Sequence, residues 1–277
     1  MQTFIIIFIV IFLIMFLNFI SKEYVQHTIS HHFSSIIIAF VYKILGKNNC
    51  VQTNSKNILK CSVDSKIFFC DKNDSIVSAS IRAGIPWESF MHQYFKKFSN
   101  KNKIALDIGA NIGTHTIYLS KYFKEVHGFE PQRKVFDLLK SNIKINNCHN
   151  VKLHNFGLGE KNEIVQMQKF DENSDYNQGG VGIDLNENDE PKGEEIYVKV
   201  LDELNLKDVG FIKLDVEGYE YFVLKGGERT ISISRPIVII ELNHKTKEYR
   251  KDIFQFFKKL RYKLTRISWH DYIAIPN

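Results

Sequence analysis

Acidic residues and glycines lie together in one short segment of this chain at a spacing that suits nucleoside binding. The segment Asp107–Gly113 places a carboxylate two residues before its first glycine, Gly109. Glycine lets the backbone turn sharply and lets a ligand approach the start of a helix. A further acid, Glu130, ends the next predicted strand, where a carboxylate can accept hydrogen bonds from both hydroxyls of a ribose. These residues predict a site for a ligand that contains a nucleoside.

The carboxylate of Asp107 helps to distinguish between two such ligands. A nicotinamide dinucleotide brings a doubly charged pyrophosphate to a turn of the pattern G-x-G-x-x-G, whereas this turn has the pattern G-x-x-x-G. An acid beside the turn would repel pyrophosphate. S-adenosylmethionine has no phosphate and carries an ammonium and a sulfonium, so an acid suits it. The segment therefore predicts S-adenosylmethionine, and a nicotinamide-dependent oxidoreductase on a similar fold is the alternative.

A second acidic segment follows a later predicted strand. Asp215 and Glu217 stand two residues apart before a glycine and a predicted helix, at the sheet edge where open α/β folds bind ligands. We predict that Glu217 and Asp215 take the proton of a methyl acceptor, with Glu241 and His244 as reserve candidates. Three alternatives stay open: Glu217 could cap the helix, His244 could be an ordinary loop histidine, and the three acids could hold Mg²⁺.

Alternating strands and helices must position these acids. Apolar runs of strand length end at both segments, and a helical period of apolar residues follows each. The predicted strands are 66–69, 104–109, 125–130, 151–154, 163–168, 196–200, 210–215 and 237–241, and the predicted helices begin near 86, 113, 131, 219 and 245. Two further strands, 262–267 and 271–275, are expected to close the chain as a hairpin. This alternation predicts an α/β fold, with a mainly parallel sheet covered by helices on both faces.

Three blocks of the sequence resemble the signature of the FkbM-type methyltransferases. They are Asp107–Gly113, Gly128–Pro131 and Ile212–Glu220, and the resemblance extends from about Ile76 to the C-terminus. At Val200 the chain departs from the family, which often has threonine there. The resemblance implies a class I, Rossmann-like, S-adenosylmethionine-dependent methyltransferase with a seven-stranded sheet whose last strand is antiparallel. It also implies O-methylation of a sugar or glycan hydroxyl, or of a related small molecule.

The resemblance carries cofactor-binding roles onto individual positions of this chain. Matched residue by residue, these positions are Asp107, Gly109, Ala110, Asn111, Gly113, Thr114, Glu130, Asn155 and Phe156. Ala110 and Thr114 would contribute backbone contacts at the turn, and Asn155 and Phe156 fall where such folds often contact adenine.

The composition is that of a globular protein. Of the 277 residues, 44% are hydrophobic and 25% charged, and the net charge is +6, which excludes a disordered or collagen-like chain. No run of five Lys or Arg residues occurs, so no nucleic-acid partner is expected. The cysteines lack C-x-x-C spacing and are expected to be free, buried thiols: Cys50, Cys61, Cys70 and Cys148. Residues 171–195, rich in acids, are expected to form a mobile surface loop.

The N-terminus predicts a membrane anchor. Residues 3–20 are apolar except for Thr3 and Asn18, and a helix of this length spans about 27 Å, close to the thickness of a bilayer core. A cleaved secretory signal is the alternative, but no basic residue precedes the run and no Ala-x-Ala-like site follows it. Lys22 slightly favours a cytosolic position for the domain that follows.

These observations divide the chain into three parts. We predict a transmembrane anchor over 1–20, a juxtamembrane linker over 21–60, and a methyltransferase domain over 61–277 with its core motifs in 104–277. Such a chain would be membrane-bound, with a glycan or small molecule as methyl acceptor. A catalytically inactive binding module tethered to a membrane is the remaining alternative.

Overall fold

The computed structural model describes residues 49–168 and 193–277. Within these ranges, no helix combines the length and the apolar character needed to cross a membrane. The predicted anchor over 1–20 lies outside the described residues, as does most of the acidic segment 171–195. Its last three residues, 193–195, were expected in a loop but begin a strand.

A seven-stranded sheet forms the centre of the molecule, in the order β12-β13-β11-β10-β4-β5-β6. Strands β11, β10, β4, β5 and β6 pair in parallel, and β13 pairs antiparallel with both β11 and β12. Their bounds are β4 Asn100–Ile108, β5 Phe123–Phe129, β6 Val151–His154, β10 Val209–Leu214, β11 Ile237–Glu241, β12 Tyr262–Arg266 and β13 Asp271–Pro276. The predicted mainly parallel sheet with a closing antiparallel hairpin is thus confirmed.

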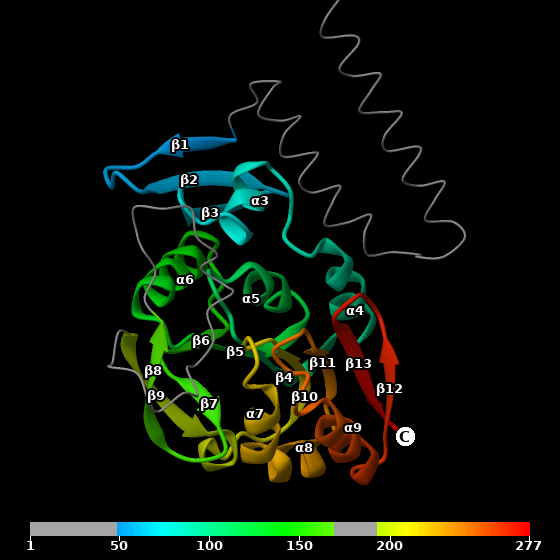
Figure 1. Ribbon diagram of the computed structural model, residues 1–277. Helices are drawn as coiled ribbons and strands as arrows, with labels where there is room; N and C mark the ends of the chain where they lie inside the picture. The colour runs from blue at the N-terminus through cyan, green and yellow to red at the C-terminus, as the bar shows by residue number, and fades with distance from the viewer. Residues whose placement is uncertain (1–48, 169–192) are drawn as a thin grey trace, which may run out of the picture.

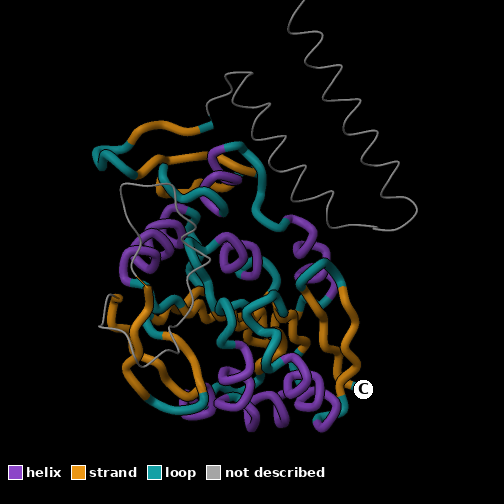
Figure 2. The backbone as a smooth tube through the Cα atoms, viewed as in Figure 1, coloured by secondary structure: helices purple, strands orange, loops and turns teal. Residues whose placement is uncertain are grey.

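Helices cover both faces of this sheet, as predicted (Figures 1 and 2). On one side lie α4 (His92–Lys97), α5 (Thr114–Leu119) and α6 (Arg133–Ile145); on the other lie α7 (Glu220–Gly226), α8 (Glu228–Ser234) and α9 (Arg250–Lys259). Apolar side chains of the sheet are buried against each layer, including Phe211 on the first side and Leu214 on the second. This burial is the main favourable contribution to folding.

Two predicted helices begin later than expected. The helix expected from Pro86 begins at His92, after a 3-10 turn over Ser89–Met91, because Glu88 adopts a left-handed backbone conformation with φ of 43°. The helix expected from Lys245 begins at Arg250, because turns closed by backbone hydrogen bonds occupy residues 244–249. The apolar periodicity continues through the first of these turns and concealed it.

A second sheet precedes the central one in the chain. It comprises β1 (Cys50–Gln52), β2 (Ile58–Val63) and β3 (Lys66–Asp71), and α3 (Val77–Arg82) follows it. Asn142 of α6 fastens β3 to the main domain, because its amide accepts a hydrogen bond from the Phe69 nitrogen and donates one to the Phe69 carbonyl. Residues 50–60, which were predicted to be part of a linker, thus form β1, a turn and the first half of β2.

A third, small sheet lies beside the central one, in the order β7-β9-β8 (Figure 1). Its strands are β7 (Gly157–Gly159), β8 (Glu163–Gln168) and β9 (Gly193–Val200). Its inner face contributes Leu158, Met167 and Val198 to the same apolar core as α7.

The expectation of free cysteines is wrong for one pair. Cys50 and Cys61 form a disulfide, because the antiparallel register of β1 and β2 places them directly opposite each other. Among the described residues, Cys70 and Cys148 are free thiols.

Candidate active site

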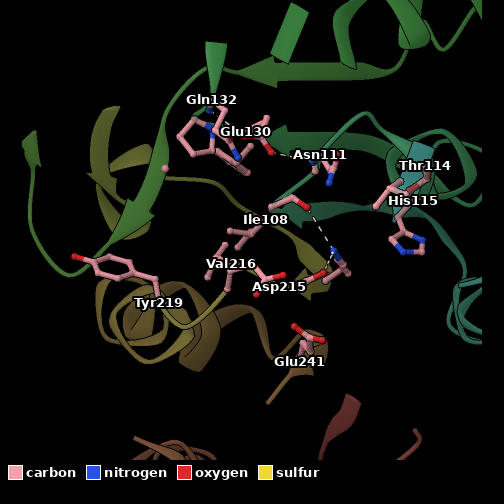
Figure 3. A pocket seen from close by; sticks show the side chains of 18 of the residues that line it. Ile108, Asn111, Thr114, His115, Glu130, Gln132, Asp215, Val216, Tyr219 and Glu241 are labelled. Atoms are coloured by element: carbon pink, nitrogen blue, oxygen red, sulfur yellow. Dashed lines mark hydrogen bonds and ion pairs between the residues drawn. The ribbon is translucent and has the colours of Figure 1, made fainter. Parts of the chain in front are cut away.

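A pocket opens at the carboxyl ends of the central strands (Figure 3). The space between its walls, including the part that is open to solvent, is about 1040 Å³. Residues that follow β4, β5, β10 and β11 line it, together with the start of α5 and parts of the segment 76–88. This is the edge where the acidic segments were expected to meet.

The glycine turn after β4 forms the floor of the pocket. Gly109 has a φ of +81°, and a Cβ atom added to it would lie 1.8 Å from the Asp215 carbonyl oxygen. The backbone nitrogens of Gly109 and Ala110 donate to the Phe129 carbonyl at 3.1 and 2.9 Å. The turn therefore holds the ends of β4, β5 and β10 together and needs glycine at position 109.

We expect Gly109→Ala to lower the free energy of unfolding by about 2–4 kcal/mol, because it combines a disfavoured φ with a backbone clash. Chemical denaturation would measure the change. Gly157→Ala is the control: its Cβ would have no neighbour nearer than 3.7 Å, and we expect about 1 kcal/mol or less. Equal effects of the two changes would contradict the explanation.

Glu130 follows β5, lies beside the glycine turn and lines the pocket (Figure 3). The backbone nitrogen of Asn111 donates to its Oε2 at 3.0 Å, and that of Gln132 donates to its Oε1 at 2.9 Å. Burial raises the pKa of Glu130 to about 7, although these two hydrogen bonds oppose the rise. Each carboxylate oxygen keeps a further lone pair. Both oxygens are thus held in place while still able to accept hydrogen bonds from a diol.

Asp215 and Lys213 form a buried ion pair at the end of β10. The Lys213 ammonium lies 2.9 Å from Asp215 Oδ2 and 3.4 Å from the Gly109 carbonyl oxygen, and only 4% of the lysine side chain is exposed. Burial alone would raise the pKa of Asp215, but the lysine charge lowers it below its usual range. Asp215 is therefore ionised at neutral pH.

Glu241, at the end of β11, behaves differently. Burial, followed by the charges of Asp215 and Glu217, raises its pKa to about 11. A hydrogen bond joins its side chain to that of Asp215. Since Glu241 keeps its proton at neutral pH and Asp215 does not, Glu241 is the donor of this bond.

Glu217 lies beside these two acids, in a left-handed backbone conformation with φ of 55°. Its Oε2 lies 2.9 Å from the Lys245 ammonium and 3.3 Å from the Asn243 amide nitrogen. Burial and the charge of Asp215 raise the pKa of Glu217 above its usual value. A carboxylate with a raised pKa is better suited to accept a proton near neutral pH.

Glu217 does not cap the helix that follows it, which removes one alternative. The backbone nitrogens of Val216 and Gly218 donate to Glu220 at 2.9 and 3.1 Å. Glu220 is itself fully buried. Glu220 therefore fastens the loop before α7, and the N-cap residue of this helix, Tyr219, makes no side-chain capping hydrogen bond.

The acids Asp215, Glu217 and Glu241 are also candidate ligands for Mg²⁺. One carboxylate oxygen each from Asp215, Glu217 and Glu241 lies within 4.8 Å of the others. However, two of these acids are already paired with ammonium groups of this chain, Asp215 with Lys213 and Glu217 with Lys245. Two ammonium groups beside the cluster oppose a divalent cation. The residues do not fit a magnesium site, and we derive no step through one.

Comparison with known proteins identifies the family. The sequence profile of the methyltransferase FkbM domain matches residues 107–264. The match covers more than half of the chain and contains the glycine turn, Glu130 and both acidic strand ends. The chain belongs to the FkbM methyltransferase family.

Individual relatives of this FkbM family member are distant. Methyltransferase 1 of Beauveria bassiana is 28% identical over an alignment of 141 residues, which covers 44% of this chain and 57% of the relative. The chain thus spans little more than half the length of this curated relative. A solved FkbM methyltransferase of Methylobacillus flagellatus KT is 23% identical, with a TM-score of 0.47, over 63% of this chain and 43% of that one.

A third relative is the tRNA (uracil-54, C5)-methyltransferase of Pyrococcus abyssi, solved in complex with S-adenosyl-L-homocysteine. It is 14% identical to this chain, with a TM-score of 0.45, over 79% of this chain and 44% of that one.

The structure brings together most of the site residues that were predicted for this protein. The predicted cofactor residues that line the pocket are Gly109, Ala110, Asn111, Thr114 and Glu130, and the predicted catalytic residues that line it are Asp215, Glu217 and Glu241.

Five predicted residues lie outside the pocket lining. Asp107 is fully buried behind it and accepts a hydrogen bond from the Thr116 hydroxyl. Asn155 donates its amide hydrogens to backbone carbonyls, and the Phe156 ring packs beneath the Lys199 ammonium. The other two are Gly113, which packs close to Leu139, and His244, which is exposed. These residues support or flank the site, and His244 is exposed outside the pocket lining.

Three residues to which sequence reasoning gave no role also line the pocket: Glu88, His115 and Lys213. Lys213 was visible within the second acidic segment, but nothing in the sequence showed that its charge would be buried. Glu88 and His115 form a pair 2.9 Å apart although 27 positions separate them. Local spacing could not reveal that contact.

Proposed function

We propose that this protein transfers a methyl group from S-adenosylmethionine to a hydroxyl of a sugar, a glycan or a related small molecule. The observation that carries the proposal is Glu130, whose two carboxylate oxygens are held by backbone amides at the rim of a pocket floored by the glycine turn. A ribose diol fits that pair of acceptors.

The chain's own residues would then perform three tasks. Bound S-adenosylmethionine supplies an electrophilic methyl group on a sulfonium. Glu130 and the glycine turn fix the orientation of the nucleoside, and alignment of this kind contributes up to about 7–11 kcal/mol in ideal cases. Glu217 accepts the proton of the acceptor hydroxyl, and the Lys245 ammonium beside it holds the carboxylate in place. Glu241 steadies Asp215 by a hydrogen bond.

Titration of the purified full-length protein with S-adenosylhomocysteine and with NAD separates the three classes of function. We expect S-adenosylhomocysteine to bind and NAD to fail, because the carboxylates beside the turn oppose pyrophosphate. Tight binding of NAD alone would favour the oxidoreductase, and binding of neither would favour an inactive module. Screening radiolabelled methyl transfer to fractionated glycans and lipids would then identify the acceptor.

The raised pKa of Glu130 predicts a pH dependence of cofactor affinity. Ribose hydroxyls donate to the ionised carboxylate, so binding must expel a proton at any pH below about 7. We expect the affinity for S-adenosylhomocysteine to fall about tenfold from pH 8 to pH 6. In Glu130→Gln this fall should vanish, while Glu220, whose pKa is also raised to about 7 by burial, still titrates in both proteins. The same fall in wild type and variant would contradict the assignment.

We also propose that residues 1–20 anchor the protein in a membrane. The support is the length of the apolar run and the absence of any Asp, Glu, Lys or Arg residue within it. We expect the full-length protein to stay with membranes through a carbonate wash and to enter solution only with detergent. Release by carbonate would contradict the anchor.

A further inference from the structure

Glu88 and His115 form a pair that joins two parts of the pocket wall. Glu88 Oε2 lies 2.9 Å from His115 Nε2, and only 4% of the histidine side chain is exposed. Glu88 precedes α4 and lies outside the part of the chain that matches the FkbM domain, whereas His115 lies in the first turn of α5, inside it. The contact therefore connects the part of the chain that matches the FkbM domain to the segment that precedes it.

The pair leaves one imidazole nitrogen available as a hydrogen-bond acceptor. The Glu88 carboxylate can only accept, so the proton of a neutral imidazole lies on Nε2 and Nδ1 carries the lone pair. Within residues 49–168 and 193–277, no hydrogen-bond partner of this buried Nδ1 is present. Burial and the nearby Lys213 charge lower the pKa of His115 to about 4, so the ring is neutral at physiological pH. A buried acceptor of this kind needs a donor, which either a water or a bound molecule can supply.

The order of the strands shows which part of a cofactor lies near His115. Glu130 follows β5, and β4 separates β5 from β10 in the sheet. With a nucleoside held by Glu130, the rest of the cofactor would lie over the end of β4, beside Thr114 and His115 at the start of α5 (Figure 3). The methionine portion of S-adenosylmethionine, which ends in an ammonium and a carboxylate, would then extend into this region.

The charges around His115 favour a cation. The Lys213 ammonium is influenced by three carboxylates, those of Asp215, Asp107 and Glu88. Three negative groups around one positive group leave the region with an excess of negative charge. A ligand ammonium compensates that excess, and the neutral imidazole adds a directed acceptor.

We infer that His115 Nδ1 accepts a hydrogen bond from the α-ammonium of S-adenosylmethionine, and that Glu88 is the positioning residue that fixes the imidazole tautomer. The inference rests on the proposed function, because it assigns a contact to the same cofactor.

Two substitutions of His115 test the roles of its two ring nitrogens separately. The amide oxygen of Asn is as many bonds from Cβ as Nδ1, and the amide of Gln reaches as far as Nε2. Thus His115→Gln keeps a partner for Glu88 and loses the acceptor, whereas His115→Asn keeps the acceptor. The probes are S-adenosylhomocysteine, which has the ammonium, and 5′-methylthioadenosine, which shares the nucleoside and lacks the amino acid portion.

We expect His115→Gln to weaken S-adenosylhomocysteine binding by calorimetry about tenfold or more, as for a hydrogen bond to a charged group. Binding of 5′-methylthioadenosine should not change, and His115→Asn should stay within about threefold of wild type for both probes. Glu88→Ala should weaken only S-adenosylhomocysteine, and Glu88→Gln should restore it, because its amide oxygen still accepts from Nε2.

Unchanged S-adenosylhomocysteine affinity in His115→Gln would overturn the inference, as expected if a buried water is the partner of Nδ1. Equal losses for both probes would overturn it too, since they indicate a general structural effect. Failure of the wild-type protein to bind either probe would instead refute the proposed cofactor, so the two failures are distinguishable.

Discussion

Glu130→Ala should weaken the binding of S-adenosylhomocysteine by at least about 100-fold. The ribose loses two hydrogen bonds to a charged group, each typically contributing about 1.5–3 kcal/mol, and about 1.4 kcal/mol corresponds to tenfold. Calorimetric titration of the full-length protein measures the change. No other predicted cofactor residue in this pocket offers a charged side chain to the ribose, so the effect should be the largest of any cofactor-site substitution.

The same substitution also removes the acceptor of two backbone amides, those of Asn111 and Gln132. Thermal unfolding must therefore accompany the titration, to confirm that the turn is still formed. Glu125→Ala is a matched control on the same strand, because Glu125 pairs with Lys152 away from the pocket. We expect the control to bind normally. An affinity of Glu130→Ala within threefold of wild type would refute the cofactor assignment.

Glu217→Gln should lower the rate of methyl transfer by about 100-fold or more while leaving cofactor affinity within a few-fold. The glutamine keeps the shape of the side chain but cannot accept the proton, and a general base typically contributes about 10²–10⁴-fold. Single-turnover rates with a reactive acceptor, measured at equal occupancy of cofactor, test this. A variant as fast as wild type would end the assignment of Glu217 as the base.

Lys245→Met provides an independent test of the same role. The ammonium lowers the pKa of Glu217 through its ion pair, so its removal should raise that pKa. Because the base must be ionised to act, the rising limb of the rate profile should move to higher pH in the variant. If Glu217 had only a structural role, the profile would stay in place and only stability would change. Added Mg²⁺ should have no effect on either variant.

Local patterns were sufficient for most of the central fold. Buried apolar runs predicted the strands that end before Gly109, Glu130, Asp215 and His244, and the structure confirms them within a few residues. These strands are long and apolar because both of their faces are covered by helices. Short strands were not predicted, including β1 and β7, which are three residues long. Strand β7 is stabilised by pairing with β9, where Gly157 lies opposite Val198, and a local pattern does not contain that contact.

The sequence by itself determined which residue types end the parallel strands, and hence that acids gather at one edge of the sheet. Only the tertiary structure decided what each acid does there. Asp107 and Glu130 read alike as acids at strand ends, yet Asp107 points to Thr116 in the buried layer and Glu130 lines the pocket. The reason is physical: a residue inside a strand must point to one face of the sheet, whereas a residue beyond the strand end is free to turn toward the ligand edge. The contact between Glu88 and His115 likewise exists only because the chain folds a distant segment over α5.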